Sequence, residues 1–448
     1  LLSQREPRFD VALDKQIAEA ADDFTRIALK AKAAKDYFLL VGPPGTGKTS
    51  CALKKMVETF YKEEGAQILL LSYTNRAVDE ICKALSSIRP EVDFIRVGSE
   101  LSCDENYRDH LIENELASCM RRTEVCERIN RCRILVGTVA SISGKPELFR
   151  LKHFDVAIVD EATQILEPQL LGILCAKGEN GKEGVGKFIL IGDHKQLPAV
   201  VLQNTEQSEV YDEALSAVGL KNLKDSLFER LYRTARQHTD AHRTYDMLCR
   251  QGRMHPEVAL FANQAFYEGR LLPVGLPHQL EDSGNINRLS FYPSQPEPMG
   301  SSAKTNHSEA KIAARLAATV YKEHSEAFDA SRTLGIITPY RSQIALIKKE
   351  IEVLGIPELN QILIDTVERF QGSERDVIIY SFCVNYPYQL KFLSNLTEED
   401  GILIDRKLNV ALTRARKQML LTGVPTLLER NPLYKSLLKL IESLRNIA

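Results

Sequence analysis

The sequence lacks three features that would narrow its function at once: an excess of charge of one sign, a long apolar run and a paired-cysteine motif. Its 58 Lys and Arg residues balance 60 Asp and Glu residues, so any surface that binds a polyanion must be a local basic groove. No apolar run reaches the roughly 18 residues that cross a bilayer, and the first residues lack the pattern of a signal peptide. We therefore expect a soluble, intracellular protein, cytoplasmic in a bacterium and nuclear or cytoplasmic in a eukaryote.

The nine cysteines contain no CxxC pair. Four of them fall close together around His110, namely Cys103, Cys119, Cys126 and Cys132. Their spacing matches no standard zinc pattern. Free thiols packed in a helical segment are the favoured interpretation, and a metal or iron-sulfur site is the alternative.

Continuous apolar runs alternate with helical patterns along most of the chain, which predicts an α/β fold with parallel sheets covered by helices on both faces. The runs form two series, so we predict two lobes, residues 1–238 and 239–448. The first series comprises residues 37–41, 67–73, 133–139, 156–160 and 187–192. The second comprises residues 333–339, 361–365, 376–383 and 418–423.

Three segments interrupt these series. Residues 85–133 are charged and helical in pattern, so we predict a helical insertion in the first lobe. Residues 178–186, GENGKEGVG, predict a loop between strands, and the Pro-, Gly- and Ser-rich residues 271–302 predict an irregular surface segment. The chain begins at Leu1, and we expect it to be part of a longer protein.

Residues 42–49, GPPGTGKT, have the spacing of a phosphate-binding loop, with an apolar run before them and a helical pattern after them. In such a loop backbone N–H groups and the following helix N-terminus surround phosphate oxygens. Lys48 is expected to reach the β- and γ-phosphates, and the Thr49 hydroxyl to bind Mg²⁺. The expected nucleotide-binding residues are Gly42, Pro43, Pro44, Gly45, Thr46, Gly47, Lys48, Thr49 and Ser50.

A phosphate loop needs an acidic partner at the end of a nearby strand to hold the metal ion. Residues 156–164, VAIVDEATQ, provide one. We predict that Asp160 binds Mg²⁺ through water, and that Glu161 orients and deprotonates the attacking water. An Asp-Glu pair that only begins a helix is the alternative.

Further motifs follow in a fixed order: VDEATQ, ILIGDHKQLPAVV, GRMHPE, ITPYRSQ, DTVERFQGSERD and LNVALTRAR. With the phosphate loop they resemble the motifs of superfamily 1 helicases. The similarity is greatest to the branch that contains the nonsense-decay RNA helicase and the flap-trimming nuclease-helicase. The resemblance covers residues 42–416 and implies two RecA-like P-loop lobes.

The resemblance also implies roles for residues outside the phosphate loop. Gln196 would touch the γ-phosphate, assisted by Asp193 and Lys195. Arg253 and Arg414 would act as arginine fingers supplied by the same chain, stabilising the charge that builds up during phosphoryl transfer. Cofactor contacts from the second lobe are expected from Gln371, Gly372 and Glu374.

Nucleic acid is expected to contact small polar side chains that follow strand ends. The candidates are Ser72, Thr74, Asn75, Gly137, Thr138, Thr338, Tyr340, Arg341, Thr366 and Arg369. Tyr73 or Tyr340 could stack on a base, although a tyrosine at a strand end is more often half-buried core.

The sequence departs from the family pattern at two places. Gly252 stands where family members usually carry a tyrosine that stacks on adenine. A glutamine that reads adenine is expected a short helix before the phosphate loop, and Gln16 and Gln4 are the candidates.

We predict an ATP- and Mg²⁺-dependent helicase that hydrolyses ATP to ADP and phosphate and moves 5′ to 3′ along a single strand, DNA in preference to RNA. The motor is expected to be monomeric. The phosphate loop is also compatible with an AAA+ type remodeller of proteins, which would take its arginine finger from a neighbouring subunit. A nucleic-acid scaffold built on an inactive motor is disfavoured by the intact Lys48 and Glu161.

Overall fold

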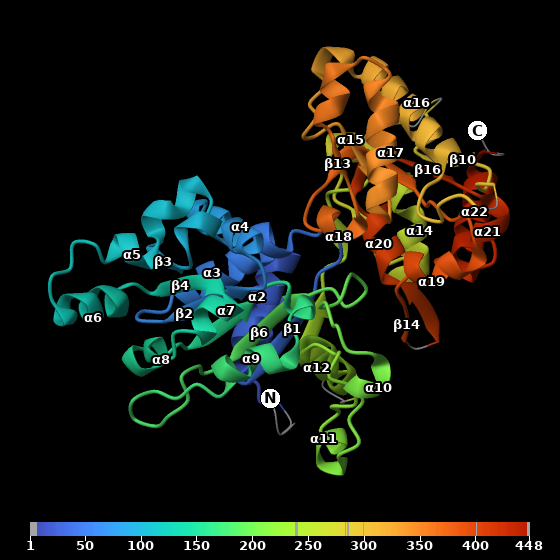
Figure 1. The fold of residues 1–448 in the computed structure, drawn as a ribbon. Helices are drawn as coiled ribbons and strands as arrows, with labels where there is room; N and C mark the ends of the chain where they lie inside the picture. Colours follow the sequence, from blue (N-terminus) through green and yellow to red (C-terminus); the bar gives the residue numbers. More distant parts are fainter. Residues whose placement is uncertain are drawn as a thin grey trace. The chain divides into compact units, whose positions relative to one another are not determined.

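The computed structural model describes residues 7–445 except 238–240, 283, 285, 299 and 400. Its chain divides into two compact units (Figure 1). The first runs to His194 and resumes over Pro198–Leu248. The second comprises Lys195–Leu197 and the chain from Cys249 onward.

The first unit contains a seven-stranded parallel sheet in the order β3-β4-β2-β5-β6-β1-β7. Its strands carry almost only buried side chains because helices cover both faces, which explains the continuous apolar runs. The strands are β1 (Tyr37–Val41), β2 (Ile68–Ser72), β3 (Phe94–Val97), β4 (Ile134–Thr138), β5 (Val156–Val159), β6 (Phe188–Gly192) and β7 (Tyr245–Met247).

Alternate residues of each strand enter two separate cores, one on each face of this sheet. On β1, for example, Phe38 and Leu40 pack with Met56 and Phe60, which belong to a helix of one face. Leu39 enters the other core. The helices of the unit are α1 (Asp14–Ala18), α2 (Asp23–Ala33), α3 (Lys54–Tyr61), α4 (Asn75–Ser86), α5 (Ile112–Glu115), α6 (Arg122–Arg131), α7 (Val139–Ser143), α8 (Glu147–Leu151), α9 (Glu167–Leu174), α10 (Thr205–Ser208), α11 (Glu213–Ala217), α12 (Leu227–Ala235) and α13 (Ala241–Thr244).

The second unit contains a five-stranded parallel sheet in the order β10-β16-β13-β11-β12. Its strands are β10 (Leu289–Pro293), β11 (Leu334–Ile337), β12 (Leu363–Asp365), β13 (Arg375–Ser381) and β16 (Ala415–Gly423). Two short pairs lie outside it: the antiparallel β14 (Leu396–Glu399) with β15 (Ile402–Asp405), and the parallel β8 (Arg250–Gln251) with β9 (Leu272–Pro273).

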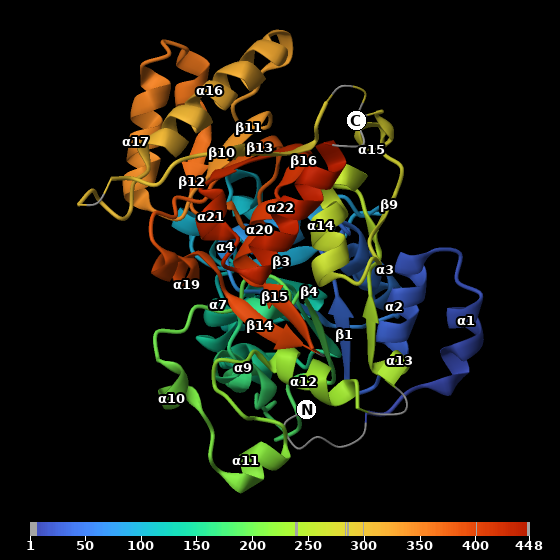
Figure 2. The same ribbon diagram turned by 90° about the vertical axis from the view of Figure 1, so that its right-hand side faces the viewer.

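Two long helices, α16 (His307–Glu323) and α17 (Arg341–Glu352), pack side by side against this sheet (Figure 2). Their apolar sides form one core with the strands, in which Ala313 and Ile347 contact residues such as Ile336. The other helices of the unit are α14 (Pro256–Phe266), α15 (Pro277–Leu280), α18 (Val367–Phe370), α19 (Leu390–Leu393), α20 (Arg406–Leu412), α21 (Pro425–Leu428) and α22 (Pro432–Arg445).

The predicted fold class is confirmed, since both units are α/β with parallel sheets covered by helices. Each predicted strand is present, and its ends lie within three residues of the expected ones. Among the described residues, no helix is both long and apolar enough to span a membrane.

Two segment predictions were wrong. Residues 85–133 are not simply a helical insertion, because β3 lies within them and pairs with β4 in the main sheet. Residues 271–302 are not simply irregular, because they contain β10, which pairs with β16. The first unit also extends past residue 238 to Leu248, since β7 pairs with β1.

Candidate functional site

The phosphate loop connects β1 to a helical segment, η2 (Lys48–Leu53). The Gly42 N–H donates to the Gly192 carbonyl at 2.9 Å, which ties the start of the loop to the end of β6. Gly45 and Gly47 have φ angles of 73° and 75°, which favour glycine. The η2 segment is π-helical, so its hydrogen bonds reach five residues back instead of four.

Gly42 provides the space in which the Lys48 side chain lies. A Cβ atom added at Gly42 would lie 2.1 Å from Cγ and 2.3 Å from Cδ of Lys48. No real contact is that short, so any side chain at this position must move Lys48. The loop sequence therefore fixes the path of its own lysine.

Gly42→Ala is expected to weaken ATP binding by about tenfold, because displacing Lys48 removes its contact with the phosphates. Titration with a fluorescent ATP analogue measures this. Gly172→Ala is the matched control, since an added Cβ there meets nothing closer than 3.8 Å and Gly172 lies in α9. Wild-type affinity in Gly42→Ala would contradict the assigned path of Lys48.

The two acidic residues that follow β5, Asp160 and Glu161, lie beside the phosphate loop. Asp160 is buried and its Oδ2 accepts a hydrogen bond from Thr49 Oγ1 at 2.5 Å. Glu161 Oε1 lies 3.4 Å from Lys48 Nζ. Burial, followed by the neighbouring Glu161 charge, raises the pKa of Asp160 to about 6. The structure thus brings together Lys48, Thr49, Asp160 and Glu161, four of the residues that the sequence singles out in this unit.

Glu161 has a left-handed backbone with φ of 53°, which is uncommon for a residue with a side chain. Its Oε2 accepts a hydrogen bond from Gln164 Nε2 at 3.0 Å. Gln164 ends the segment VAIVDEATQ, and the sequence alone indicates no role for it. Its position three residues after Glu161 is the only signal that could have indicated this contact.

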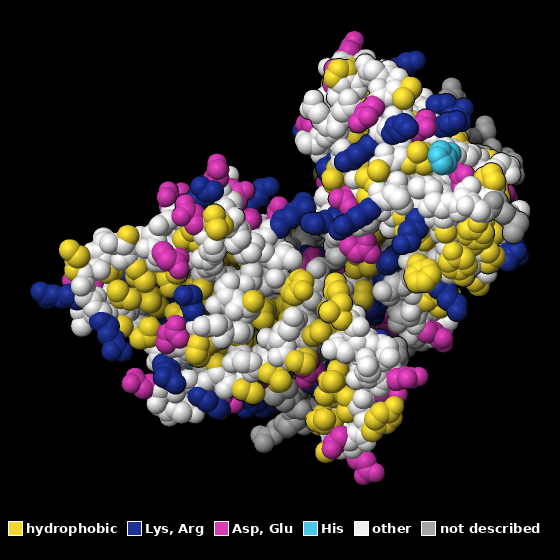
Figure 3. All heavy atoms as spheres, viewed as in Figure 1, with side chains coloured by type: hydrophobic (Ala, Val, Ile, Leu, Met, Phe, Trp, Pro, Cys, Tyr) yellow, Lys and Arg dark blue, Asp and Glu magenta, His cyan; other side chains and the backbone are white. Residues whose placement is uncertain are grey.

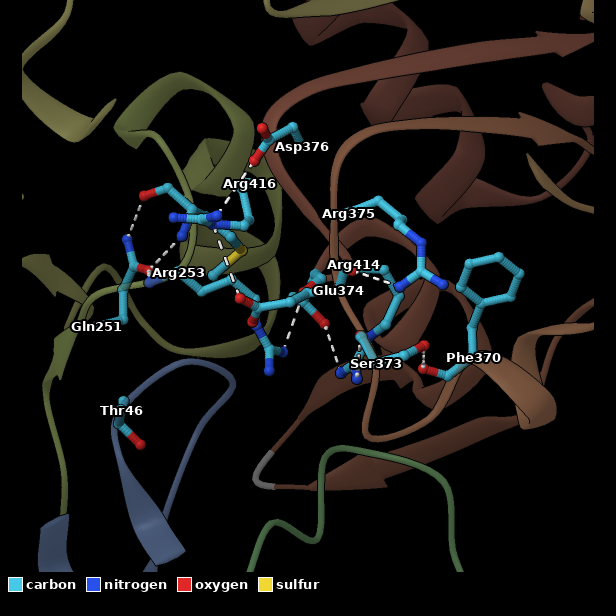
Figure 4. Close-up of polar contacts among 12 residues, drawn as sticks. Thr46, Gln251, Arg253, Phe370, Ser373, Glu374, Arg375, Asp376, Arg414 and Arg416 are labelled. Atoms are coloured by element: carbon cyan, nitrogen blue, oxygen red, sulfur yellow. Dashed lines mark hydrogen bonds and ion pairs between the residues drawn. The ribbon is translucent and has the colours of Figure 1, made fainter. Parts of the chain in front are cut away.

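In the second unit, Glu374 lies between two arginines (Figure 4). Arg253 Nε lies 2.5 Å from Glu374 Oε2, and Arg416 Nε lies 3.7 Å from Oε1. Arg416 also pairs with Asp376 at 3.2 Å. Burial tends to raise the pKa of Glu374, but the nearby Arg253, Arg416 and Arg414 charges outweigh it, and the pKa is lowered.

Arg414 is 2% exposed and is held by several acceptors. Its guanidinium donates to the Val410 carbonyl at 2.9 Å, the Ser373 carbonyl at 3.4 Å and Gln196 Oε1 at 3.3 Å. Gln196 falls in the three-residue stretch that groups with the second unit. A guanidinium presents several N–H donors in a fixed planar arrangement. A buried guanidinium can therefore bind the oxygen atoms of an anion.

The remaining cofactor candidates, Gln371 and Gly372, directly precede Ser373, whose carbonyl accepts from Arg414. Gln371 follows α18, and Gly372 has a φ of 79°. Two residues without a predicted role support the site. Arg416 neutralises Glu374, and Gln251 Oε1 accepts the Arg253 N–H at 3.0 Å.

The nucleic-acid candidates divide by exposure. Side chains of three lie in the interior: Ser72 donates to the Asp160 carbonyl at 3.1 Å, Thr138 caps α7, and Thr338 is fully buried. Gly137 is also buried, and a Cβ there would meet the Val97 carbonyl oxygen at 2.8 Å. The candidates that are exposed or partly exposed are Thr74, Asn75, Tyr340, Arg341, Thr366 and Arg369.

The cysteine cluster does not form a ligand set in the described part of the chain, where no group of three or more His, Cys, Asp and Glu side chains could hold a metal ion. Cys132 Sγ instead donates to the Ile134 carbonyl at 3.2 Å, and His110 stacks on Phe94 with ring centroids 4.0 Å apart. Of the adenine candidates, Gln16 is exposed on α1, and Gln4 lies outside the described residues.

A buried polar network supports the loop that follows β13. Glu309 of α16 accepts hydrogen bonds from Ser381 Oγ at 2.7 Å, the Cys383 N–H at 2.8 Å and Ser294 Oγ at 3.4 Å. Burial raises the pKa of Glu309 from 4.5 to about 7, although these three donors act in the opposite direction.

Glu309→Gln is expected to stabilise the protein above neutral pH. Between pH 4.5 and about 7 the folded state binds more protons at Glu309 than the unfolded state, so the free energy of unfolding falls as the pH rises through this window. Glutamine keeps the shape of the side chain, and its amide can accept a hydrogen bond from Ser381 and donate one to Ser294. Because glutamine does not titrate, the free energy of unfolding no longer falls in this pH window. At about pH 8 the gain is on the order of 3 kcal/mol.

Urea unfolding at several pH values measures this effect. Glu326→Gln, an exposed glutamate of the same unit, is the matched control. Parallel pH profiles for wild type and Glu309→Gln would show that Glu309 does not titrate in this window.

Both units match known families. Residues 19–127 and 118–204 match one family model described as an AAA domain, and residues 223–426 match a second model with the same description. The "DNA replication ATP-dependent helicase/nuclease DNA2" of Gallus gallus is 30% identical over 90% of this chain and 36% of its own length. The protein of the same name from Bos taurus is 28% identical over 99% of this chain and 42% of its own length.

A third relative is the "DNA polymerase alpha-associated DNA helicase A" of Saccharomyces cerevisiae, which is 26% identical over 91% of this chain and 65% of its own length. The chain thus spans less than two thirds of each relative. The two parallel-sheet units, the phosphate loop and these matches together confirm the resemblance to superfamily 1 helicases. Over most of its length the chain is similar to the helicase/nucleases named above.

Proposed function

We propose that this chain is a motor that moves 5′ to 3′ along single-stranded nucleic acid and hydrolyses ATP to ADP and phosphate. The observation that carries the proposal is the constellation of Lys48 and Thr49 with Asp160 and Glu161 at the ends of β1 and β5. DNA is the favoured strand, because the relatives at 26–30% identity are named as DNA helicases. The motor is proposed to act as a monomer.

The first lobe, predicted as residues 1–238, would hold the nucleotide. The loop residues 42–50 would surround the phosphates with N–H groups, and the Lys48 charge would neutralise the β- and γ-phosphates. Glu161 would accept a proton from the attacking water. The 3.4 Å pair with Lys48 holds the Glu161 carboxylate beside the lysine that would contact the phosphates.

Mg²⁺ fits the residues present. The Thr49 hydroxyl and the Asp160 carboxylate are hard oxygen donors 2.5 Å apart, and such donors suit Mg²⁺. Burial and the neighbouring Glu161 charge raise the pKa of Asp160, and the Lys48 charge only partly opposes them, so a divalent cation would be favoured here. When bound, Mg²⁺ would neutralise charge on the phosphates.

The second lobe, predicted as residues 239–448, would supply Arg253 and Arg414 as arginine fingers. Gln196, in the predicted first lobe, would act as a γ-phosphate sensor. Gln371, Gly372 and Glu374 would complete the nucleotide contacts. The Glu374 carboxylate already holds the Arg253 side chain in one orientation, which lowers the cost of ordering that side chain at the nucleotide.

Nucleic acid would contact the exposed candidates directly, namely Thr74, Asn75, Tyr340, Arg341, Thr366 and Arg369. The buried Ser72, Gly137, Thr138 and Thr338 would contribute through their backbone groups. Phosphate contacts of this kind position a strand without reading its sequence.

The direction of movement and the strand preference are tested together by displacement of streptavidin from biotinylated oligonucleotides of DNA and of RNA. We expect ATP-dependent displacement from the 3′ end of DNA and weaker displacement from RNA. Displacement from the 5′ end only would refute the direction. Activity that requires assembly into a ring would favour the AAA+ type remodeller, which no present observation supports.

A further inference from the structure

Three segments of the second unit meet where β11 and β13 end. Gln389 Nε2 donates to the Ala303 carbonyl at 2.6 Å and to the Tyr340 hydroxyl at 3.1 Å. Ser342 Oγ donates to the Lys304 carbonyl at 2.7 Å. Residues 303–304, 340–342 and 385–392 therefore form one continuous surface.

Aromatic side chains project from this surface. Tyr388 is 55% exposed and Phe392 is 63% exposed. The Tyr386 and Tyr388 rings are stacked with centroids 5.8 Å apart and planes within 12°. Single exposed apolar residues are ordinary, but several aromatic rings within seven residues mark a binding surface. We call Tyr386, Tyr388 and Phe392 the aromatic platform.

The three segments that form this surface also carry cations. Lys304, Arg341 and Lys391 are exposed, and none of the three forms an ion pair within the described residues. Lys407 Nζ donates to the Phe392 carbonyl at 3.2 Å. Figure 3 shows hydrophobic side chains beside a Lys or Arg side chain where Figure 1 labels α19.

Two carboxylates belong to neighbouring segments. Glu368 pairs with Lys407 at 3.2 Å, and Glu297 lies 3.1 Å from His307, which is charged only when protonated. The three cations without an ion pair in the described part of the chain outnumber these carboxylates. A surface that combines exposed rings with uncompensated cations matches a single-stranded polyanion with flat bases. An apolar protein partner would leave these charges without counterions.

The segment that carries the platform is rigidly held. Asn385 Nδ2 donates to the Thr305 carbonyl at 2.8 Å, and Gln389 Oε1 accepts the Asn385 and Tyr386 N–H groups at 2.9 Å. Asn306 Nδ2 joins Asn385 to the buried network around Glu309. Rings that are already fixed lose little freedom when a base stacks on them.

We propose that the aromatic platform stacks bases of single-stranded nucleic acid while Lys304, Arg341 and Lys391 contact its phosphates. This inference rests on the proposed function and names a binding site beyond the helicase motifs. The platform adjoins Tyr340 and Arg341, so it lengthens the strand path in the second unit.

Binding of a fluorescent single-stranded DNA to the full chain, measured by anisotropy, tests the platform. We expect Tyr388→Ala and Phe392→Ala each to weaken binding about tenfold, the usual effect of losing one stacked base. Tyr388→Phe keeps the ring and should bind like wild type. Tyr211→Ala, which removes a 79% exposed tyrosine of the first unit, is the matched control.

Two further measurements distinguish the loss of base stacking from a general loss of structure. A strand containing 2-aminopurine should lose fluorescence on binding to wild type and retain it with the double variant Tyr388→Ala, Phe392→Ala. Lys391→Glu should lower the slope of log affinity against log salt by about one or more. Normal thermal unfolding of each variant confirms that it is folded.

The outcomes distinguish the two proposals. If wild type binds the strand and both alanine variants bind equally well, the platform is refuted while the motor stands. If wild type binds neither DNA nor RNA, both proposals fail. Loss of binding in the alanine variants with retention in Tyr388→Phe supports the platform.

Discussion

Lys48→Ala is expected to lower strand-stimulated ATP turnover by on the order of a thousandfold, because it removes the positive charge next to the phosphates that react. The side chain is preorganised for this task. Its stem lies in the space left by Gly42, and its ammonium group is 3.4 Å from Glu161. Truncation leaves no other lysine or arginine of the loop to take its place, since residues 42–47 and 49–50 carry no charge.

Glu161→Gln is the companion substitution. Glutamine keeps the size and the contact with Gln164 but cannot accept a proton from water, so nucleotide binding should persist while turnover is lost. Release of phosphate from purified protein measures turnover, and Lys182→Ala, an exposed lysine of the first unit, is the control. Retained turnover in Lys48→Ala or Glu161→Gln would refute the roles assigned to them.

Arg414→Ala should lower turnover by about 10³- to 10⁵-fold while ATP binding remains within a few-fold of wild type. An arginine finger acts on charge that develops in the transition state, so its loss affects turnover far more than binding. Arg414→Lys should lose turnover as well. An ammonium group cannot reproduce the planar set of N–H donors by which the guanidinium contacts Val410, Ser373 and Gln196.

The buried position of Arg414 requires a test of folding for each variant. Removing the guanidinium leaves the Val410 and Ser373 carbonyls without this donor, so thermal unfolding must accompany the kinetics. Arg315→Ala, an exposed arginine of α16, is the matched control in the same unit. Equal losses of ATP binding and turnover in folded Arg414→Ala protein would argue against a finger.

Much of the fold could be predicted because strands that helices cover on both faces consist of uninterrupted runs of apolar residues. Residues 37–41 and 156–160 are two such runs, and each ends in the residues that form the candidate site. The phosphate loop was equally visible, since its glycine spacing reflects backbone geometry and the path of Lys48.

Two of the missed strands, β3 and β10, have individual causes. In β3 the apolar pattern is broken by Arg96, whose buried guanidinium pairs with Asp79. In β10 the strand lies inside a Pro- and Ser-rich stretch and ends at Pro293, and its partner β16 is far away in sequence. Both lie at an edge of their sheet, where a strand needs fewer apolar residues.

The sequence indicated which residues belong to the candidate site better than it indicated which of them contact one another. Arg253 and Glu374 were both selected, but no pattern indicates that they pair across 121 positions of sequence. Ser72 and Thr338 follow strands as nucleic-acid contacts should, yet both side chains are buried. Burial depends on packing between distant segments, which a short motif does not encode.

The central claim is that ATP hydrolysis at Lys48 and Glu161 is coupled to a single strand of nucleic acid. The ATPase rate of the purified chain, measured with and without single-stranded DNA and with a matched RNA, tests it most directly. We expect DNA to raise the rate several-fold or more and RNA to raise it less. An ATPase rate that neither DNA nor RNA changes would contradict the account.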